Sequence, residues 1–346
     1  GYRTQNRRCG GHMIICRTPF RVSLFGGGTD YPPWYEKHGG AVLGFAIDKY
    51  CYISVRKLPP FFEHKHRIVY SKVENVVSVD DIKHPAVRGV LSQHQLEDGL
   101  EIHHDGDLPA RSGLGSSSSF TVGMLNALAA FQGRIVSKRH LAREAIRIEQ
   151  DIINEKVGCQ DQIWAAYGGL NRINFLQTGE FDVQPAIVSN DRRSDLQDHL
   201  MLVFTGITRL APAMAEKQMQ NLDAREAQLK EMMAMVDEAQ SILHDARSSI
   251  SDVGVLLHQS WLLKRELAEG VSNPVIDEIY NAATGAGASG GKLLGAGGGG
   301  FMLFVVEPSK QAKVREALND LVAVKIAIDN VGSKIVVYEP DGLEYA

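Results

Sequence analysis

A stretch rich in glycine and serine, "PARSGLGSSSS" at positions 109–119, is followed directly by the apolar run "FTVGMLNALAAF". The apolar run predicts a buried helix from about Ser117 to Gln132, so the stretch is not a free interdomain linker. A helix start has unpaired N–H groups and partial positive charge, and Gly113 and Gly115 would let a phosphate approach them. A serine-rich helix cap explains the local pattern equally well.

Two further glycine clusters occur in the chain. One is "FRVSLFGGGTDY" at positions 20–31, and the other is "GASGGKLLGAGGGGF" at positions 287–301. None of the three contains the Walker pattern, which needs Gly-Lys-Ser/Thr at its end. The letters G-x-G-x-x-G at 295–300 precede a predicted strand, whereas a dinucleotide fingerprint follows one. Three clusters so far apart are better explained as walls of one site than as three linkers.

Composition excludes several classes of function. The chain has 346 residues and a formal net charge of −4, so nothing indicates a nucleic-acid or anionic-membrane partner. No apolar run approaches the ~20 residues of a membrane span. The four cysteines form no C-x-x-C pair, and we expect free thiols in a reducing, cytoplasmic compartment. Met13 resembles a natural start, so we expect residues 1–12 to be a foreign or disordered arm.

The first half of the chain alternates strands with glycine-bearing turns, whereas the second half is dominated by long helical patterns. This organisation, without internal repeats, predicts an α+β fold. We expect strands at 13–25 with a break near Pro19, at 39–58 as a hairpin or bent strand, and at 66–71, 100–109, 168–175, 199–207, 301–307 and 334–339. We expect helices at 117–132, 137–155, 211–245, 253–269, 274–285 and 309–321, and a short helix after "VGCQDQ".

The three glycine clusters, in this order, resemble the three motifs of the galactokinase, homoserine kinase, mevalonate kinase and phosphomevalonate kinase superfamily. The matching stretches are "PFRVSLFGGGTDY", the phosphate-binding "LPARSGLGSSSS" and "KLLGAGGGGFMLF", and the similarity covers residues 14–340. The resemblance implies a ribosomal protein S5 domain 2-like N-terminal domain over 13–195, which carries the Gly/Ser loop. It also implies a ferredoxin-like C-terminal domain over 196–346, with the site between the two.

Within this superfamily the chain most closely resembles bacterial D-glycero-D-manno-heptose 7-phosphate kinases, through "FGGGTDYPPWY", "CQDQIWAAYGGLN", "VFTGITRLA" and "KLLGAGGGGFM". Those enzymes phosphorylate the anomeric hydroxyl of the sugar phosphate and give the 1,7-bisphosphate. The resemblance implies ATP, Mg²⁺ and a small-molecule sugar phosphate as partners, and it leaves a homodimer open. Two alternatives remain: a fucokinase-like kinase acting on an unphosphorylated sugar, and a regulator that binds sugar and ATP without turnover.

The resemblance assigns the catalytic roles to Asp161 and Arg21. A carboxylate at Asp161 would accept or orient the proton of the attacking hydroxyl. Arg21 would hold that carboxylate ionised and steady the transferring phosphoryl group. From the local sequence alone, Asp161 would be a helix N-cap and Arg21 an edge-strand charge.

The resemblance also assigns the nucleotide and metal ligands. Glu149 would ligate Mg²⁺ together with a hydroxyl of the phosphate loop, for which we favour Ser117 over Ser116. By local sequence alone Glu149 would be a solvated helix residue. The predicted ATP-binding residues are Gly113, Leu114, Gly115, Ser116, Ser117 and Ser118.

The substrate pocket is predicted from the first and third clusters. Asp30 would accept hydrogen bonds from sugar hydroxyls, although an Asp after glycine is also a common turn residue. Galactokinase has Glu-His where this chain has Gly27 and Gly28, so galactose is not expected to be the substrate. Cations for a substrate phosphate would come from Arg111, Arg209 or Lys292. The full set of predicted substrate-binding residues is Gly28, Thr29, Asp30, Arg111, Arg209, Gly297 and Gly298.

Overall fold

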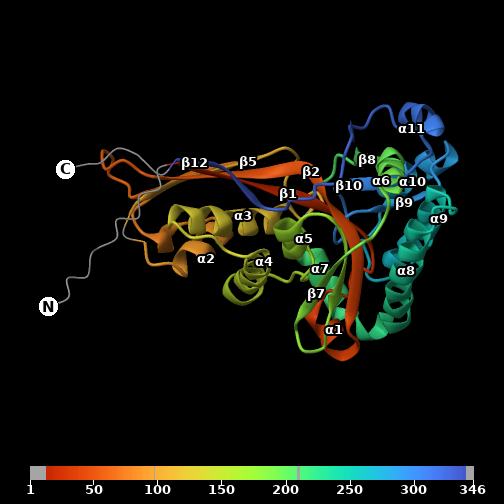
Figure 1. The fold of residues 1–346 in the computed structure, drawn as a ribbon, viewed down its shortest axis with the longest axis horizontal. Helices are drawn as coiled ribbons and strands as arrows, with labels where there is room; N and C mark the ends of the chain where they lie inside the picture. Colours follow the sequence, from red (N-terminus) through yellow and green to blue (C-terminus); the bar gives the residue numbers. More distant parts are fainter. Residues whose placement is uncertain (1–12, 97, 209–210, 340–346) are drawn as a thin grey trace.

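The computed structural model describes residues 13–96, 98–208 and 211–339, which form an eight-stranded and a four-stranded sheet with helices packed against them (Figure 1). The expected arm at residues 1–12 lies outside this range. The strands of the first sheet are β1 (Met13–Phe25), β2 (Gly40–Lys57), β3 (His66–Val69), β4 (Val73–Val76), β5 (Leu100–Gly106), β6 (Leu170–Phe175), β7 (Phe181–Pro185) and β12 (Lys334–Glu339). Six of them follow the order β12-β1-β2-β5-β3-β4, while β6 pairs with β2 and β7 with β6.

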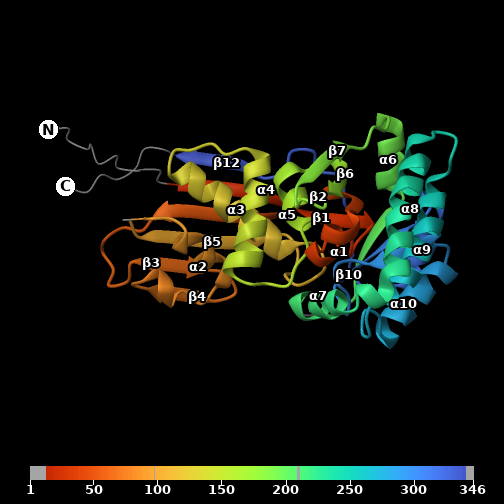
Figure 2. The same ribbon diagram turned by 90° about the horizontal axis from the view of Figure 1, so that it is seen from below.

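Helices of the first half cover one face of this sheet, as Figure 2 shows from below. They are α1 (Pro32–His38), α2 (Pro85–Ser92), α3 (Ser116–Phe131), α4 (Lys138–Arg147) and α5 (Asp161–Tyr167), with a short 3-10 turn η1 (Val79–Asp81) and a π-helical turn η2 (Ile148–Ile152). The apolar run that predicted α3 packs against β1 and β2. Gly123 brings the helix close, because a Cβ there would lie 2.8 Å from Thr18 Oγ1.

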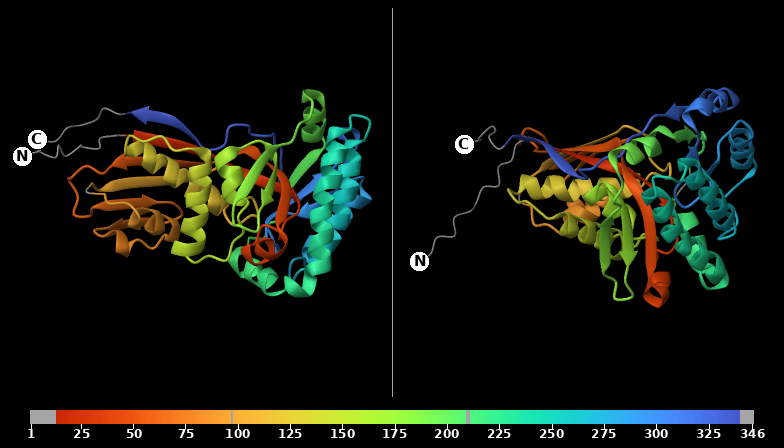
Figure 3. Two further views of the ribbon diagram at one scale, coloured as in Figure 1. Left: turned by 60° about the horizontal axis from the view of Figure 1, so that its bottom comes forward. Right: turned by 45° about the vertical axis from the view of Figure 1, so that its right-hand side comes forward.

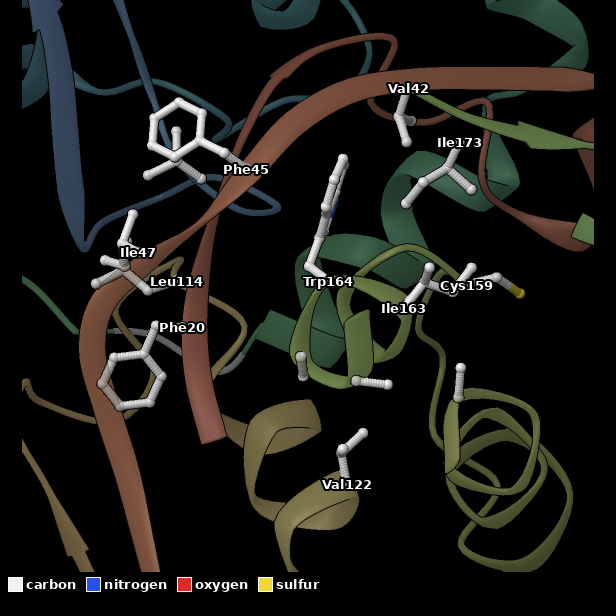
Figure 4. Close-up of a cluster of buried hydrophobic side chains, with 14 of the residues drawn as sticks. Phe20, Val42, Phe45, Ile47, Leu114, Val122, Cys159, Ile163, Trp164 and Ile173 are labelled. Carbon is white, nitrogen blue, oxygen red and sulfur yellow. The ribbon is translucent and has the colours of Figure 1, made fainter. Parts of the chain in front are cut away.

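The core of the first half fixes the start of α5. Trp164 is fully buried, and side chains from β1, β2, α3 and β6 converge on its surroundings (Figure 4). Phe20, Phe45 and Ile173 are among them. Since a buried Trp is one of the largest contributors to a core, α5 cannot shift without loss of packing. The orientation of its first residue, Asp161, is set by this packing.

The second half builds the smaller sheet in the antiparallel order β11-β8-β10-β9. Its strands are β8 (Leu200–Phe204), β9 (Gly290–Leu293), β10 (Phe301–Val305) and β11 (Ala323–Val324). Its helices are α6 (Asn190–Asp198), α7 (Ala211–Gln220), α8 (Glu226–His244), α9 (Ile250–Arg265), α10 (Pro274–Gly285) and α11 (Gln311–Ala317), with 3-10 turns η3 (Asp223–Arg225) and η4 (Pro308–Lys310). No helix of the described residues is long and apolar enough to cross a membrane.

Several predicted elements are confirmed and others differ. The helix at 274–285 and the strand at 334–339 have the predicted bounds. The predicted break near Pro19 is wrong, because β1 is one continuous strand. Only its register against β2 shifts between Pro19 and Arg21. The hairpin alternative for 39–58 is wrong as well, since β2 is one strand of 18 residues. The helices predicted at 137–155 and 211–245 are each divided into shorter helices.

The predicted domain boundary needs one correction. β12 pairs antiparallel with β1, from Met13 opposite Glu339 to Arg17 opposite Lys334. The last strand therefore belongs to the first sheet, and Figure 3 shows it apart from the rest of the C-terminal half. Residues 196–346 are not one continuous domain for this reason. A strand pattern in the sequence does not record which sheet the strand joins.

The first glycine turn offers a stability test. A Cβ at Gly26 (φ +85°) would lie 1.9 Å from the Ala41 carbonyl oxygen, whereas Gly133 (φ +71°) has nothing within 4 Å. Gly133→Ala should lower the free energy of unfolding by roughly 1–2 kcal/mol, the left-handed penalty alone. We expect Gly26→Ala to lower it by about 3 kcal/mol or more, because backbone must also move. Urea titrations measure both; equal losses would contradict a close approach at Gly26.

Candidate active site

The Gly/Ser loop ends beside two charged side chains. Gly115 precedes α3 in a left-handed conformation (φ +70°), and a Cβ there would lie 3.2 Å from Arg21 Cγ and 3.3 Å from Asp161 Cγ. No side chain caps the N-terminus of α3. The alternative of a serine-rich cap is therefore wrong, and the first N–H groups of α3 stay available to an anion.

Arg21 and Asp161 form a short ion pair at this loop. Arg21 Nε donates to Asp161 Oδ1 at 2.7 Å, and Arg21 Nη1 donates to the Gly113 carbonyl at 2.6 Å. Arg21 is buried in β1, so the edge-strand alternative is wrong, whereas 27% of the Asp161 side chain is exposed. Asp161 is the first residue of α5 and makes no capping bond. The predicted proximity is confirmed: one arginine connects the Gly/Ser loop to a carboxylate that is partly exposed to solvent.

Glu149 lies behind this pair in the π-helical turn η2. Its side chain is buried, and Glu149 Oε2 accepts hydrogen bonds from Ser118 Oγ at 3.1 Å and from Gln162 Nε2 at 2.5 Å. Burial raises the pKa of Glu149 to about 8. The solvated-helix alternative is therefore wrong. The hydroxyl beside Glu149 belongs to Ser118 rather than the favoured Ser117, which is exposed one residue earlier on α3.

The donor set around Glu149 fits a magnesium ion that is shared with a phosphate. Glu149 Oε1 is buried and has no hydrogen-bond partner. Mg²⁺ commonly takes one or two carboxylates and completes its shell with water and phosphate oxygens. No group of three or more His, Cys, Asp or Glu residues in the described part of the chain could hold a metal ion by itself. A phosphate from the neighbouring loop would therefore be needed to complete the site.

The first glycine turn contributes one exposed gap and one buried carboxylate. Gly27 faces open space, whereas a Cβ at Gly28 would lie 2.8 Å from Leu229 Cδ2. Only Gly27 therefore leaves room where galactokinase carries a side chain. Thr29 is fully buried, and its hydroxyl is used by Gly26 and Ala41 backbone groups. Its predicted contact with substrate is wrong, because Thr29 holds the turn itself.

Asp30 packs between this turn and the segment before α5. Its Oδ1 accepts from the Gly28 N–H at 3.1 Å, and its backbone carbonyl accepts from Cys159 N at 3.1 Å. A Cβ at Gly158 would lie 1.9 Å from Asp30 Oδ2, so only glycine allows this approach. Burial raises the pKa of Asp30 to about 6, and the charge of Asp161 adds to the shift. No local pattern predicts this role of Gly158, because Asp30 lies far away in the chain.

The third glycine cluster packs on the second. A Cβ at Gly295 would lie 2.6 Å from Gly113 Cα, and Phe301 N donates to the Ser112 carbonyl at 2.9 Å. The predicted substrate contacts of Gly297 and Gly298 are not supported. A Cβ at Gly297 would lie 2.8 Å from Val271 Cα, and Gly298 N donates to the Val271 carbonyl at 3.0 Å. These two glycines allow close packing on Val271.

Comparison with known proteins places this site in a family. The GHMP kinases N terminal domain matches residues 82–169, and the GHMP kinases C terminal domain matches residues 242–323. A D-glycero-alpha-D-manno-heptose 7-phosphate kinase of Campylobacter jejuni is 31% identical over 315 residues, 88% of this chain and 93% of the relative. The chain belongs to the GHMP kinase family. As a GHMP kinase it is an ATP-dependent phosphotransferase with an N- and a C-terminal domain of mixed α/β content.

Two further relatives of this GHMP kinase are more distant. The bifunctional fucokinase/GDP-fucose pyrophosphorylase of Arabidopsis thaliana is 26% identical over 337 residues, 90% of this chain but 32% of the relative. A crystal structure of a D-glycero-D-manno-heptose 1-phosphate kinase from Bacteriodes thetaiotaomicron superposes with a TM-score of 0.67 at 24% identity. That match covers 92% of this chain and 97% of the other. The structural match shows the shared fold.

The three cations predicted to bind a substrate phosphate have different outcomes in this GHMP kinase. Arg111 is exposed, has a positive φ of 57° and forms no side-chain hydrogen bond or ion pair with another described residue. Arg209 lies outside the described residues. Lys292 is buried and donates to the Ser23 carbonyl at 2.8 Å, so it is not free for a substrate. A second buried lysine, Lys264 on α9, was missed because its partners lie about 30 residues later in the chain.

The raised pKa of Asp30 predicts a pH-dependent stability. A carboxyl whose folded pKa exceeds its unfolded value stabilises the fold below the unfolded value of 3.8, and this contribution is lost as pH rises through about 6. Between pH 4 and pH 8 the wild-type protein should lose roughly 3 kcal/mol of its free energy of unfolding through Asp30, and Asp30→Asn should not show this loss. Denaturant titrations of the ligand-free proteins measure this. Asp223→Asn, on an exposed side chain, is the control, and parallel curves for wild type and Asp30→Asn would contradict the assignment.

Proposed function

We propose that the chain is a sugar kinase that transfers the γ-phosphoryl group of ATP to the anomeric hydroxyl of D-glycero-D-manno-heptose 7-phosphate, giving the 1,7-bisphosphate. The observation that carries the transfer is the Arg21–Asp161 pair beside Gly115 at the uncapped start of α3. The choice of sugar rests on the 31% identical heptose 7-phosphate kinase. The regulator alternative is less well supported, because Asp161 and Glu149 are both in place.

Each side chain has a definite task in this mechanism. The N–H groups at the start of α3 bind phosphate oxygens, and Gly113 and Gly115 keep side chains out of the way. Asp161 accepts the proton of the sugar hydroxyl as that oxygen attacks phosphorus. Arg21 orients the carboxylate and its charge stabilises the negative charge that develops on the transferring group. Mg²⁺, held by Glu149 and Ser118, would neutralise phosphate charge.

The first glycine turn supports a sugar that is larger than galactose or bound in a different orientation. Gly27 leaves open space in the wall, and the Asp30 carboxyl is buried where it can select hydroxyl groups. Arg111 lies within the Gly/Ser stretch, its exposed side chain has no described partner, and it is our candidate for the substrate phosphate. A fucokinase-like activity on an unphosphorylated sugar is the second candidate, supported by the Arabidopsis relative. A fucokinase-like activity would give Arg111 no substrate phosphate to bind.

Finer fold and location assignments belong to the same proposal. The smaller sheet has the chain order strand–helices–strand–strand–helix–strand and the spatial order β11-β8-β10-β9, which supports a ferredoxin-like C-terminal domain. We assign the larger sheet to the S5 domain 2-like type by the same resemblance. Cys16, Cys51 and Cys159 are buried and free, which supports a reducing, cytoplasmic location.

A substrate panel tests the proposed function. We expect ADP release with D-glycero-D-manno-heptose 7-phosphate to exceed that with heptose, fucose or galactose by at least ~10²-fold in kcat/KM, because a site that pairs with the phosphate rejects analogues lacking it. Phosphorus NMR of the product should place the new phosphate on C1. Equal turnover of fucose would support the fucokinase alternative, and binding of ATP without turnover of any sugar would support the regulator.

Asp161→Asn tests the catalytic assignment in the same assay. Asn keeps the size and can still accept from Arg21 but cannot take a proton. We expect kcat to fall by roughly 10² to 10⁴-fold, whereas nucleotide affinity and stability should change little, since Asp161 caps nothing. Calorimetry with Mg·ADP and thermal unfolding are the controls. Full activity in the variant would remove Asp161 from the mechanism.

Serine variants on adjacent positions test the metal assignment. Ser118 bonds to Glu149, whereas Ser117 is exposed. We expect Ser118→Ala and Glu149→Gln to lower turnover and to shift the Mg²⁺ titration to higher concentration. Ser117→Ala should leave the half-saturating Mg²⁺ concentration within about twofold, because a lost ligand, and not a lost surface hydroxyl, weakens metal binding. A larger shift of the Mg²⁺ titration in Ser117→Ala than in Ser118→Ala would support Ser117 as the metal ligand instead.

A further inference from the structure

Two lysines are buried behind the glycine clusters without a carboxylate partner. Lys292 on β9 and Lys264 on α9 expose 6% and 7% of their surface. Lys292 Nζ donates to the carbonyls of Ser23 at 2.8 Å and Leu24 at 3.4 Å. Among the described residues, no carboxylate oxygen lies within 4.0 Å of either ammonium group. Such burial is unfavourable for a charged group, so an ordinary packing role does not explain it.

The hydrogen bonds of these lysines join all three glycine clusters. Lys264 Nζ donates to the carbonyls of Leu293 at 2.7 Å and Gly295 at 2.5 Å, both within the third cluster. Gly295 packs directly on Gly113 of the second cluster. Lys292, which itself belongs to the third cluster, donates to β1 inside the first cluster, at Ser23 and Leu24 just before the three glycines. The smaller sheet is thereby fastened to the strand that carries the catalytic arginine.

We propose that Lys264 and Lys292 are positioning residues for phosphoryl transfer: they lock the third glycine cluster against the phosphate loop and against β1, and they place positive charge there that a bound triphosphate neutralises. The proposal rests on the phosphate-binding role of the loop. Neither lysine needs to touch a reactant. Their effect passes through the Gly113 backbone, whose carbonyl holds Arg21, and through Arg21 to Asp161.

The charged groups around the lysines support the proposed interaction between their positive charge and a bound triphosphate. Burial and, to a smaller extent, the cation of Arg21 lower the pKa of Lys292 to about 7, although the charge of Asp30 acts in the opposite direction. Burial also lowers the pKa of Lys264, to which Lys292 and Arg21 contribute. A polyanion bound at the loop favours the protonated ammonium groups. The two lysines should therefore take up protons when nucleotide binds near pH 7, and their contribution to nucleotide affinity should weaken as pH rises above 7.

Methionine variants separate positioning from mere packing. Met resembles Lys in length and removes the charge, so Lys264→Met and Lys292→Met should keep or raise the free energy of unfolding. We expect kcat at saturating ATP to fall by about 10²-fold in each, because small displacements of a catalytic group have effects of this size. Lys230→Met, on an exposed side chain of α8 that pairs with Glu226, is the matched control and should leave kcat unchanged.

Proton uptake gives a readout that a structural role would not move. Calorimetry of Mg·ADP binding at pH 7, without sugar and in two buffers of different ionisation enthalpy, counts the protons taken up. We expect Lys292→Met to take up fewer protons, or to release more, than the wild-type protein, because Glu149 gives up its proton to Mg²⁺ in both proteins and only the lysine differs. Unchanged kcat in both methionine variants, loss of their folded state, or equal proton numbers in wild type and Lys292→Met would each overturn the proposal. The same difference in proton number without turnover of any sugar would contradict the proposed function and the positioning role, and would leave only the coupling between the charge of the lysines and nucleotide binding.

Discussion

The close approach of Gly113 and Gly295 is the contact on which the site depends. At this point the backbone of the larger domain meets that of the smaller one with no room for a Cβ on either side. The Gly113 carbonyl accepts from Arg21, and the Gly295 carbonyl accepts from Lys264. A pair of glycines thus connects a cation of each domain. The abundance of glycine in the third cluster follows from packing as much as from ligand binding.

Burial of opposite charges without full pairing is the second property of the site. Asp30 and Glu149 have raised pKa values, and Lys292 has a lowered one, for the same reason: each is removed from water. A protein that binds a polyanion and a divalent cation together can leave its own groups under-compensated, because the ligands complete the balance. Such buried charges lower the stability of the ligand-free fold and favour the binding of ligands that compensate them.

The parts of this arrangement that could be predicted from the sequence are those with local patterns. The Gly/Ser loop with its apolar helix predicted α3, and the order of three motifs indicated the family. The pairing of Arg21 with Asp161 followed from the resemblance. The predictions that were wrong depend on the direction in which a side chain points or on partners far away in the chain. Successive helix residues point about 100° apart, so choosing Ser117 instead of Ser118 turned the hydroxyl away from Glu149. The roles of three other residues depend on contacts with distant partners, which no local pattern reveals: Thr29, Gly158 and Lys264.

The pairing of β12 with β1 affects how the chain can fold while it is being synthesised. β1 lies between β2 and β12, so one edge of β1 stays unpaired until residues 334–339 have left the ribosome. Translation delivers the whole smaller sheet in between. A nascent chain therefore carries an open strand edge throughout the synthesis of the smaller sheet, and such edges recruit other strands. The larger sheet is completed only after the smaller one has been synthesised, although its first strand is made earlier.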